Sequence, residues 1–363
     1  MPIGFPESKS GAEIRILKQL FSPDEAKIAL ELSALPEPIE KIHKRLKKTG
    51  ISKEELEKKL DTLVMKGSII GNHSVDQQIN GKLYGKVPLA IGMYELQGGR
   101  ITKELEQDMS EYMEEMFYKE FHSKKTSQMR TVPINTSVTS DKFIDSYDNV
   151  RDIILNTEEA IAVGPCVCRT GRDQVDESCS CSDIRDTCLF IGNSAQLLLD
   201  LGHARMITKD ETFKILDDAE KHGFVLQPEN AGNPTFICCC CSCCCHMLSG
   251  LKMFPNPSEY FHSNYQAVVN AADCTECENC VDVCPMEALS IVNEVSTVDL
   301  NRCIGCGVCV TDCTGSAIML KAKDKKHVPP ETRDDLYKKI MVERFGMMGM
   351  LKMMPKMLLG RKI

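Results

Sequence analysis

Apolar residues recur every three to four positions through the first third of the chain, which is the period of an amphipathic helix. Between residues 10 and 92 this pattern predicts short helices, separated by capping signals such as Ser22-Pro23. Between residues 100 and 122 an acidic helix carries one apolar stripe, made of Leu105, Met109, Met113, Met116 and Phe117. That stripe predicts packing against a core.

The predicted elements of residues 1–122 are three or four short helices followed by a β-like segment with a turn near Asn80-Gly81. This order resembles a winged helix-turn-helix domain, with residues 52–66 in the position of the recognition helix. The resemblance implies docking to DNA or to protein. Lysines on this helix are balanced by acidic residues, whereas affinity for DNA needs a cationic surface. We therefore expect a protein-docking domain and no nucleic-acid partner.

The pattern then predicts a polar linker or extended strand at residues 123–145 and a cysteine-rich domain at residues 146–269. Two helices are expected in that domain. One begins at Leu189 and ends near Gly202, and the other begins at Thr208, which is predicted to form a capping box with Glu211. The fold class expected for the whole chain is α+β and multidomain, with a helical cysteine-rich domain.

Composition adds the first indication of chemistry. The chain has 363 residues, enough for two or three domains, with 42% hydrophobic residues and a net charge of −8. Its start has no basic and apolar secretory signal, so the expected compartment is the reducing cytoplasm. The 20 cysteines are therefore better explained as thiolate ligands of metals or iron–sulfur clusters than as disulfides.

Eight of these cysteines form two runs with the pattern C-x2-C-x2-C-x3-C, and the second run repeats the first at an offset of 29 residues. Three closely spaced thiolates can bind three irons of a cubane, and a fourth cysteine from elsewhere binds the last. Residues 270–323 thus resemble a bacterial two-cluster ferredoxin domain. In that family the fourth cysteine of each run binds the other cluster. Zinc knuckles are the alternative, but they use separated pairs of ligands.

The resemblance implies two ligand sets, one for each [4Fe–4S] cluster. The first is Cys274, Cys277, Cys280 and Cys313, and the second is Cys303, Cys306, Cys309 and Cys284. The first run ends in Cys284-Pro285 as in the family, whereas the second ends in Cys313-Thr314. This departure is expected to change the hydrogen bonds to the sulfur atoms, and therefore the reduction potential of the cluster, more than the binding of the cluster. The apolar segments that follow each run predict short strands, with a turn near Asn293-Glu294.

Twelve cysteines remain, and seven of them fall within eight consecutive positions: Cys166, Cys168, Cys179, Cys181, Cys188, Cys238, Cys239, Cys240, Cys241, Cys243, Cys244 and Cys245. The dense run cannot converge on one point, because neighbours in a strand point to opposite faces and a helix also separates them. We therefore predict that it shares its thiols with the upstream cysteines, and that together they bind one or two further iron–sulfur clusters. Inert buried thiols are the alternative for some of them.

Two neighbours of these cysteines carry other candidate roles. His246 directly follows the dense run and is expected to donate a hydrogen bond or be exposed, with metal ligation as the alternative. Arg169, next to Cys168, is expected to offset thiolate charge or to lie on the surface.

The tail, residues 324–363, is basic and rich in methionine, which suits docking to a partner protein, with peripheral membrane contact as the alternative.

The succession of GPCVCR, CLFIGNSA, HGFVLQPEN, the dense run and two ferredoxin motifs resembles multi-cluster iron–sulfur proteins encoded by anaerobes. Because cysteine-ligated cubanes exchange one electron each, we expect an oxygen-sensitive electron-transfer protein that passes low-potential electrons through several clusters to or from a partner oxidoreductase. No motif of a nucleotide or flavin site occurs in the sequence. Two alternatives stay open: an iron–sulfur redox sensor that regulates transcription, and a cysteine-cluster reductase that acts on a disulfide.

Overall fold

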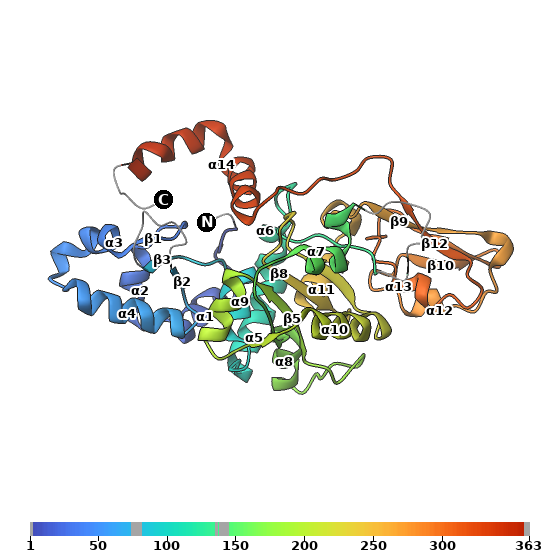
Figure 1. Ribbon diagram of the computed structural model, residues 1–363, viewed down its shortest axis with the longest axis horizontal. Helices are drawn as coiled ribbons and strands as arrows, with labels where there is room; N and C mark the ends of the chain where they lie inside the picture. Colours follow the sequence, from blue (N-terminus) through green and yellow to red (C-terminus); the bar gives the residue numbers. More distant parts are fainter. Residues whose placement is uncertain (1–2, 74–81, 135–136, 138–144, 359–363) are drawn as a thin grey trace.

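The computed structural model describes residues 3–73, 82–134, 137 and 145–358, without the side chains of residues 72–73 and 352–358. The turn predicted near Asn80-Gly81 lies outside these residues. The molecule is elongated, with the amino-terminal helices at one end, a five-stranded sheet in the middle and two strand pairs at the other end (Figure 1).

The amino-terminal part combines helices with a small antiparallel sheet. Its elements are α1 (Ala12–Leu20), α2 (Pro23–Leu30), β1 (Glu37–Pro38), α3 (Ile39–Leu46), α4 (Lys53–Met65), β2 (Ile70–His73) and β3 (Lys82–Gly85). The strand order is β1-β3-β2. Ser22 and Glu25 form a complete capping box at the start of α2. Apolar residues from α3 and α4, such as Ile42, Leu56 and Leu60, are fully buried between these elements.

The predicted acidic helix is present as α5 (Lys103–Tyr112), a π-turn at Met113–Phe117, and α6 (Tyr118–Phe121). Its stripe packs into the main core. Met109, Met113 and Phe117 are completely buried, and Met116 is partly buried.

The cysteine-rich region is built on an antiparallel sheet, so the expectation of a helical domain is wrong. The strand order is β6 (Arg205–Ile207), β4 (Ile161–Pro165), β5 (Asp186–Ile191), β8 (Phe236–Cys240) and β7 (Val225–Pro228). Residues Leu189–Ile191, which we expected in a helix, lie in β5, because a short apolar run has no period that separates a buried strand from a helix.

Helices α7 (Val150–Asn156), α8 (Val167–Gln174), α9 (Asn193–Asp200), α10 (Lys209–Lys221) and α11 (His246–Lys252) pack around this sheet (Figure 1). Thr208 caps α10 and accepts a hydrogen bond from the Glu211 amide at 3.1 Å. Residues 126–134, within the stretch predicted as linker or strand, are extended and buried, and Val132 bridges to Leu226 of β7.

The two cysteine runs form a structural repeat with the same offset of 29 residues as the sequence. The first half contains β9 (Tyr265–Val269), α12 (Asn279–Asp282) and β10 (Leu289–Val292), and the second contains β11 (Val295–Val298), α13 (Val308–Thr311) and β12 (Ile318–Ala322). β9 pairs with β12 and β10 pairs with β11, so each strand pair joins the two halves. Asn293 and Glu294, both with positive φ, form the tight turn predicted between β10 and β11.

The last helix, α14 (Arg333–Leu358), is kinked at Gly346, whose φ is 68°. Its first turns are packed into the core through Leu336 and Ile340, whereas Met347 and Met348 are exposed. Among the residues that the structure describes, no helix combines the length and the apolar character needed to cross a membrane.

A buried histidine at the end of α6 predicts that the folded chain loses stability at acidic pH. His122 is surrounded by the rings of Phe121, Phe254, Tyr260 and Phe261, and its ring nitrogens have no hydrogen-bond partner among the described residues. Burial lowers the pKa of His122 to about 4. The unfolded chain therefore binds a proton that the folded chain excludes as pH falls from about 6.5 to 4, and we expect stability to decrease by about 1.4 kcal/mol per pH unit in that window.

The measurement is anaerobic denaturant unfolding of the full chain at several pH values, with the variant His122→Leu as the comparison. The variant should lose this contribution to the pH slope. Equal slopes for the two proteins would contradict the prediction.

Candidate metal centres

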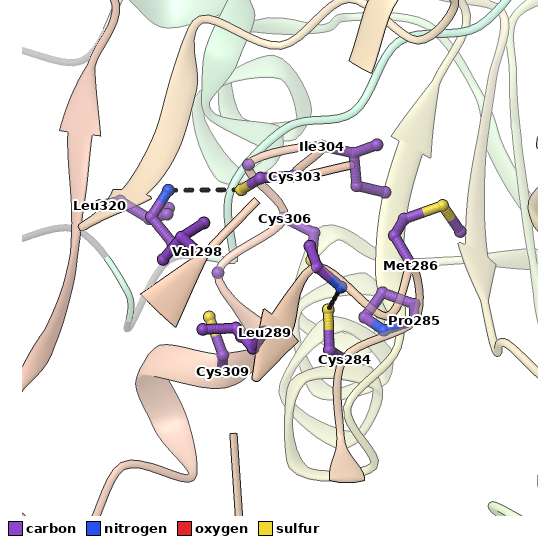
Figure 2. A pocket seen from close by; sticks show the side chains of 14 residues that line it. Cys284, Pro285, Met286, Leu289, Val298, Cys303, Ile304, Cys306, Cys309 and Leu320 are labelled. Carbon is purple, nitrogen blue, oxygen red and sulfur yellow. Dashed lines mark hydrogen bonds between the residues drawn. The ribbon is translucent and has the colours of Figure 1, made fainter. Parts of the chain in front are cut away.

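One cavity is lined by thiols from both halves of the repeat. Cys284 of the first run points into it beside Cys303, Cys306 and Cys309 of the second (Figure 2). The empty space is about 360 Å³, and the remaining lining is mostly apolar. We call this the inner ferredoxin site. Its four thiols match the donor set of a [4Fe–4S] cluster.

A second cavity, of about 300 Å³, is lined by the complementary thiols Cys274, Cys277, Cys280 and Cys313. We call this the outer ferredoxin site, because Cys277 is exposed, whereas the three cysteines contributed by the second run to the inner site are all buried. The thiols expected to share a cluster therefore lie together in both cases.

Backbone N–H groups donate to the sulfur atoms in a pattern that follows the repeat. Ala267 donates to Cys303 and Ser296 to Cys274, both at 3.4 Å. Cys284 and Cys313 each accept from the amide four residues further on, at 3.2 Å. Such hydrogen bonds raise the reduction potential of a bound cluster, because they favour the more negative state.

Two contacts distinguish the outer site from the inner site. Thr314, which replaces the proline of the family pattern, donates a hydrogen bond to Cys277 at 3.7 Å. Glu276 and Glu278 have positive φ in the outer loop, and the corresponding inner positions are Gly305 and Gly307. A Cβ at Gly305 would lie 2.1 Å from the Tyr265 carbonyl oxygen, so the inner loop packs too closely for a side chain there. The two sites therefore offer different environments to chemically equal ligand sets.

The central sheet divides the dense cysteine run between its two faces. In β8 the side chains alternate, so Cys238 and Cys240 point to one face and Cys239 to the other, and Cys241, directly after the strand, packs with Cys239. The two pairs accordingly belong to different hydrophobic clusters. The sequence argument that the run must share out its thiols is consistent with this arrangement.

Six thiols meet on the first face and form what we call the six-thiol group. Cys188 in β5 is the direct cross-strand partner of Cys238 in β8. The six thiols lie near one another, since each shifts the pKa of two others, in the order Cys166, Cys188, Cys238, Cys240, Cys245, Cys168 and back to Cys166. Cys166 and Cys245 each precede the first turn of a helix, where the helix dipole favours a thiolate.

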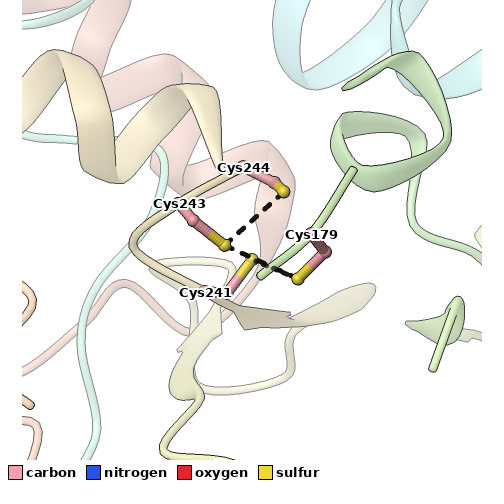
Figure 3. A group of neighbouring side chains, drawn as sticks. All are labelled: Cys179, Cys241, Cys243 and Cys244. Carbon is pink, nitrogen blue, oxygen red and sulfur yellow. Dashed lines mark hydrogen bonds between the residues drawn. The ribbon is translucent and has the colours of Figure 1, made fainter. Parts of the chain in front are cut away.

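Four thiols meet on the opposite face, and we call them the four-thiol group (Figure 3). Its members Cys179, Cys241, Cys243 and Cys244 have sulfur atoms that all lie within 4.8 Å of one another. Cys181 contacts Cys243 at 3.4 Å but lies outside this group. Cys239 is buried on the same face and is in neither group.

Arg169 lies between the two groups and is completely buried. Its guanidinium donates to the Cys239 carbonyl at 3.0 Å and to the Thr187 hydroxyl at 2.5 Å, and it stacks on the Phe224 ring. Burial lowers the pKa of Arg169, but the neighbouring Cys166 and Cys241 thiolates raise it by more. The buried cation thus offsets thiolate charge, which is one of the two roles expected from the sequence.

A buried polar network adjoins the six-thiol group. His246 contacts Glu106 through Nε2 at 3.0 Å and Tyr118 through Nδ1 at 3.5 Å, so both ring nitrogens are engaged by protein groups. Glu106 also accepts from the Tyr94 hydroxyl at 2.7 Å and is fully buried. Burial raises the pKa of nearby Glu95 to about 8.

Sequence reasoning missed these acidic residues. Glu106 belongs to the acidic helix, where only the apolar stripe was expected to pack against the core, and a glutamate that turns inward leaves no local signal. The only hint was a histidine directly after a cysteine run.

Comparisons with known proteins agree with the interpretation of the two thiol-lined cavities as iron–sulfur cluster sites. Residues 266–314 match the family model of a 4Fe–4S dicluster domain. The chain is 40% identical over 50 residues to an uncharacterized ferredoxin of Methanocaldococcus jannaschii, covering 13% of this chain and 33% of that protein. It is 40% identical over 48 residues to a ferredoxin of Rickettsia felis, covering 13% and 44%. No solved structure matches the chain.

These residues are therefore a 4Fe–4S dicluster ferredoxin domain, which supports iron–sulfur electron transfer by this part of the chain. The matched segment spans less than half the length of either ferredoxin. The amino-terminal part and the central sheet lie outside it.

Proposed function

We propose that this protein relays single electrons between a partner oxidoreductase and its own interior. The outer ferredoxin site receives or delivers electrons at the surface, the inner site passes them on, and a third cluster in the six-thiol group is the internal terminus. The observation that carries this proposal is the gradient of exposure, from exposed Cys277 to the buried thiols of the inner site.

A direct connection between the inner site and the six-thiol group supports the order of the relay. Helix α11 starts immediately after Cys245 and is about 10 Å long, given its seven residues. At its far end the Lys252 carbonyl accepts a hydrogen bond from Arg302, the neighbour of Cys303, at 3.3 Å.

The donor sets fit the proposed cofactors. Cysteine thiolates are the ligands that iron–sulfur clusters require, and these clusters exchange one electron each. Burial raises the pKa of Cys306 to about 12, so a bound metal has to replace the proton of this thiol. The chain's own residues thus provide the ligands, the hydrogen bonds to sulfur and the exclusion of water.

For the amino-terminal part we propose docking to the partner protein. The order of helices and strands supports the winged-helix resemblance. Lys53 at the start of α4 pairs with Glu40, and Lys66 directly after its end pairs with Glu25, so the cationic groups that DNA would need are partly neutralised. A gel shift with random duplex at low salt should show no cluster-dependent binding, and a clear shift would favour a transcription regulator.

The relay is tested by anaerobic reduction of the full chain with a low-potential ferredoxin as donor, followed by rapid freezing and EPR. In the wild-type protein the signal assigned to the six-thiol cluster should appear after those of the ferredoxin clusters. In Cys303→Ala, which removes a ligand of the inner site, reduction of the six-thiol cluster should slow at least tenfold. An unchanged rate would contradict the relay, and rapid disulfide reduction without any partner would favour a reductase.

A further inference from the structure

We propose that the four-thiol group binds a single tetrahedral Zn²⁺ ion, and that it is not the ligand set of an iron–sulfur cubane. The twelve cysteines of the central region are then divided by chemistry as well as by position. The six-thiol group serves electron transfer, and Cys179, Cys241, Cys243 and Cys244 form a structural metal site.

The spacing of the sulfur atoms is the main argument. Cys179 Sγ lies 3.7 Å from Cys241 Sγ and 3.5 Å from Cys243 Sγ, and the sulfur atoms of Cys243 and Cys244 are 3.6 Å apart. A Zn–S bond of about 2.3 Å in a tetrahedron places its four sulfur ligands about 3.8 Å from one another. These three separations are close to that edge, all four sulfur atoms lie within 4.8 Å of one another, and the side chains converge (Figure 3).

A cubane places four irons and four sulfides between its thiolates, so those thiolates cannot be in mutual contact. The same structure shows the contrast. At the inner ferredoxin site, the four cysteines line a cavity, and their sulfur atoms are not drawn together within 4.8 Å as those of the four-thiol group are. At the four-thiol group, they touch one another.

The local backbone explains how one ion fits here. β8 ends at Cys240, and the chain turns so that the Cys245 amide donates to the Cys241 carbonyl at 3.2 Å. This turn brings Cys241, Cys243 and Cys244 together. Cys179 arrives from the loop after α8, which Arg185 anchors through its ion pair with Asp173 at 2.7 Å. The ion would therefore fasten that loop to the end of β8.

Burial and charge agree with a closed structural site. Three of the four thiols are buried, and Cys243 alone among them is exposed. Four thiolates and one Zn²⁺ have a net charge of about −2, which needs a compensating cation in the interior. Arg169 supplies it, because its completely buried guanidinium donates to the Cys239 carbonyl, two residues before Cys241, at 3.0 Å.

The first measurement is zinc and iron per chain in anaerobically purified full-length protein, with zinc K-edge X-ray absorption on the same sample. We expect about one zinc per chain with four sulfur neighbours at about 2.3 Å. No zinc, or zinc with oxygen and nitrogen neighbours as for an adventitious ion, would overturn the assignment. Because this measurement uses the wild-type protein, it does not depend on a variant folding.

Two substitutions then locate the ion. Cys244→Ser should lower zinc at least fivefold and leave iron and the EPR spectra unchanged, whereas Cys181→Ser should retain both metals. Loss of about four irons from Cys244→Ser would mean that the group holds a cubane, and it would overturn the proposal. Neither result affects the relay through the ferredoxin sites, so the two proposals can fail separately.

Discussion

Replacing Cys284 by alanine should remove the same iron–sulfur cluster as replacing Cys303, although the two residues lie in different cysteine runs. Cys284 lines the inner cavity together with the three leading cysteines of the second run. Each substitution removes one of four thiolates, and we expect iron to fall by about four per chain and one EPR signal to disappear. Iron, acid-labile sulfide and low-temperature EPR of the reduced protein provide the measurement.

The matched controls are Cys274→Ala and Cys313→Ala, which should both remove the other signal. The two signals can be told apart because the outer site is more exposed and has the Thr314 hydrogen bond to Cys277. If Cys284→Ala instead removed the signal that Cys274→Ala removes, each run would hold its own cluster and the crossed ligand sets would be wrong.

The second large effect concerns two adjacent residues of β8. Cys240→Ala removes a member of the six-thiol group, and we expect the third cluster to be lost, with about four irons per chain. Cys239→Ala changes the next residue, which points to the opposite face of the sheet and is in neither thiol group. The two residues are 6% and 2% exposed, so the substitutions remove similarly buried side chains.

Cys239→Ala should therefore keep its full iron content and EPR spectrum, although it loses some stability through the small cavity. Iron analysis of the two variants, purified side by side without oxygen, gives the answer. Equal iron loss in both would mean that the metal is lost through unfolding. Undiminished iron in both would mean that the six-thiol group does not bind a cluster.

The repeated cysteine runs allowed the ferredoxin domain to be predicted from the sequence, because each run holds four ligand cysteines within 11 residues. A cluster needs closely spaced thiols, and that need fixes the local spacing. The turn at Asn293-Glu294 and the helix cap at Thr208 were predictable for the same reason, since each depends on neighbours in the chain.

The central sheet was not predictable in this way. Its strands β4, β5 and β8 are short apolar runs, and burial on both faces removes the alternation that would identify them. The buried contacts of Glu106 with Tyr94 and His246 were hidden as well, because these partners come from distant segments.

The sequence by itself determined the dicluster ferredoxin domain and required the dense cysteine run to divide its thiols, because alternating neighbours in a strand cannot meet at one point. Which upstream thiols meet was decided only by the tertiary structure. Strand pairing places Cys188 opposite Cys238, and the loop after α8 brings Cys179 to Cys241 on the other face. Those contacts depend on the register and packing of segments far apart in the chain, and no local pattern of residues specifies them.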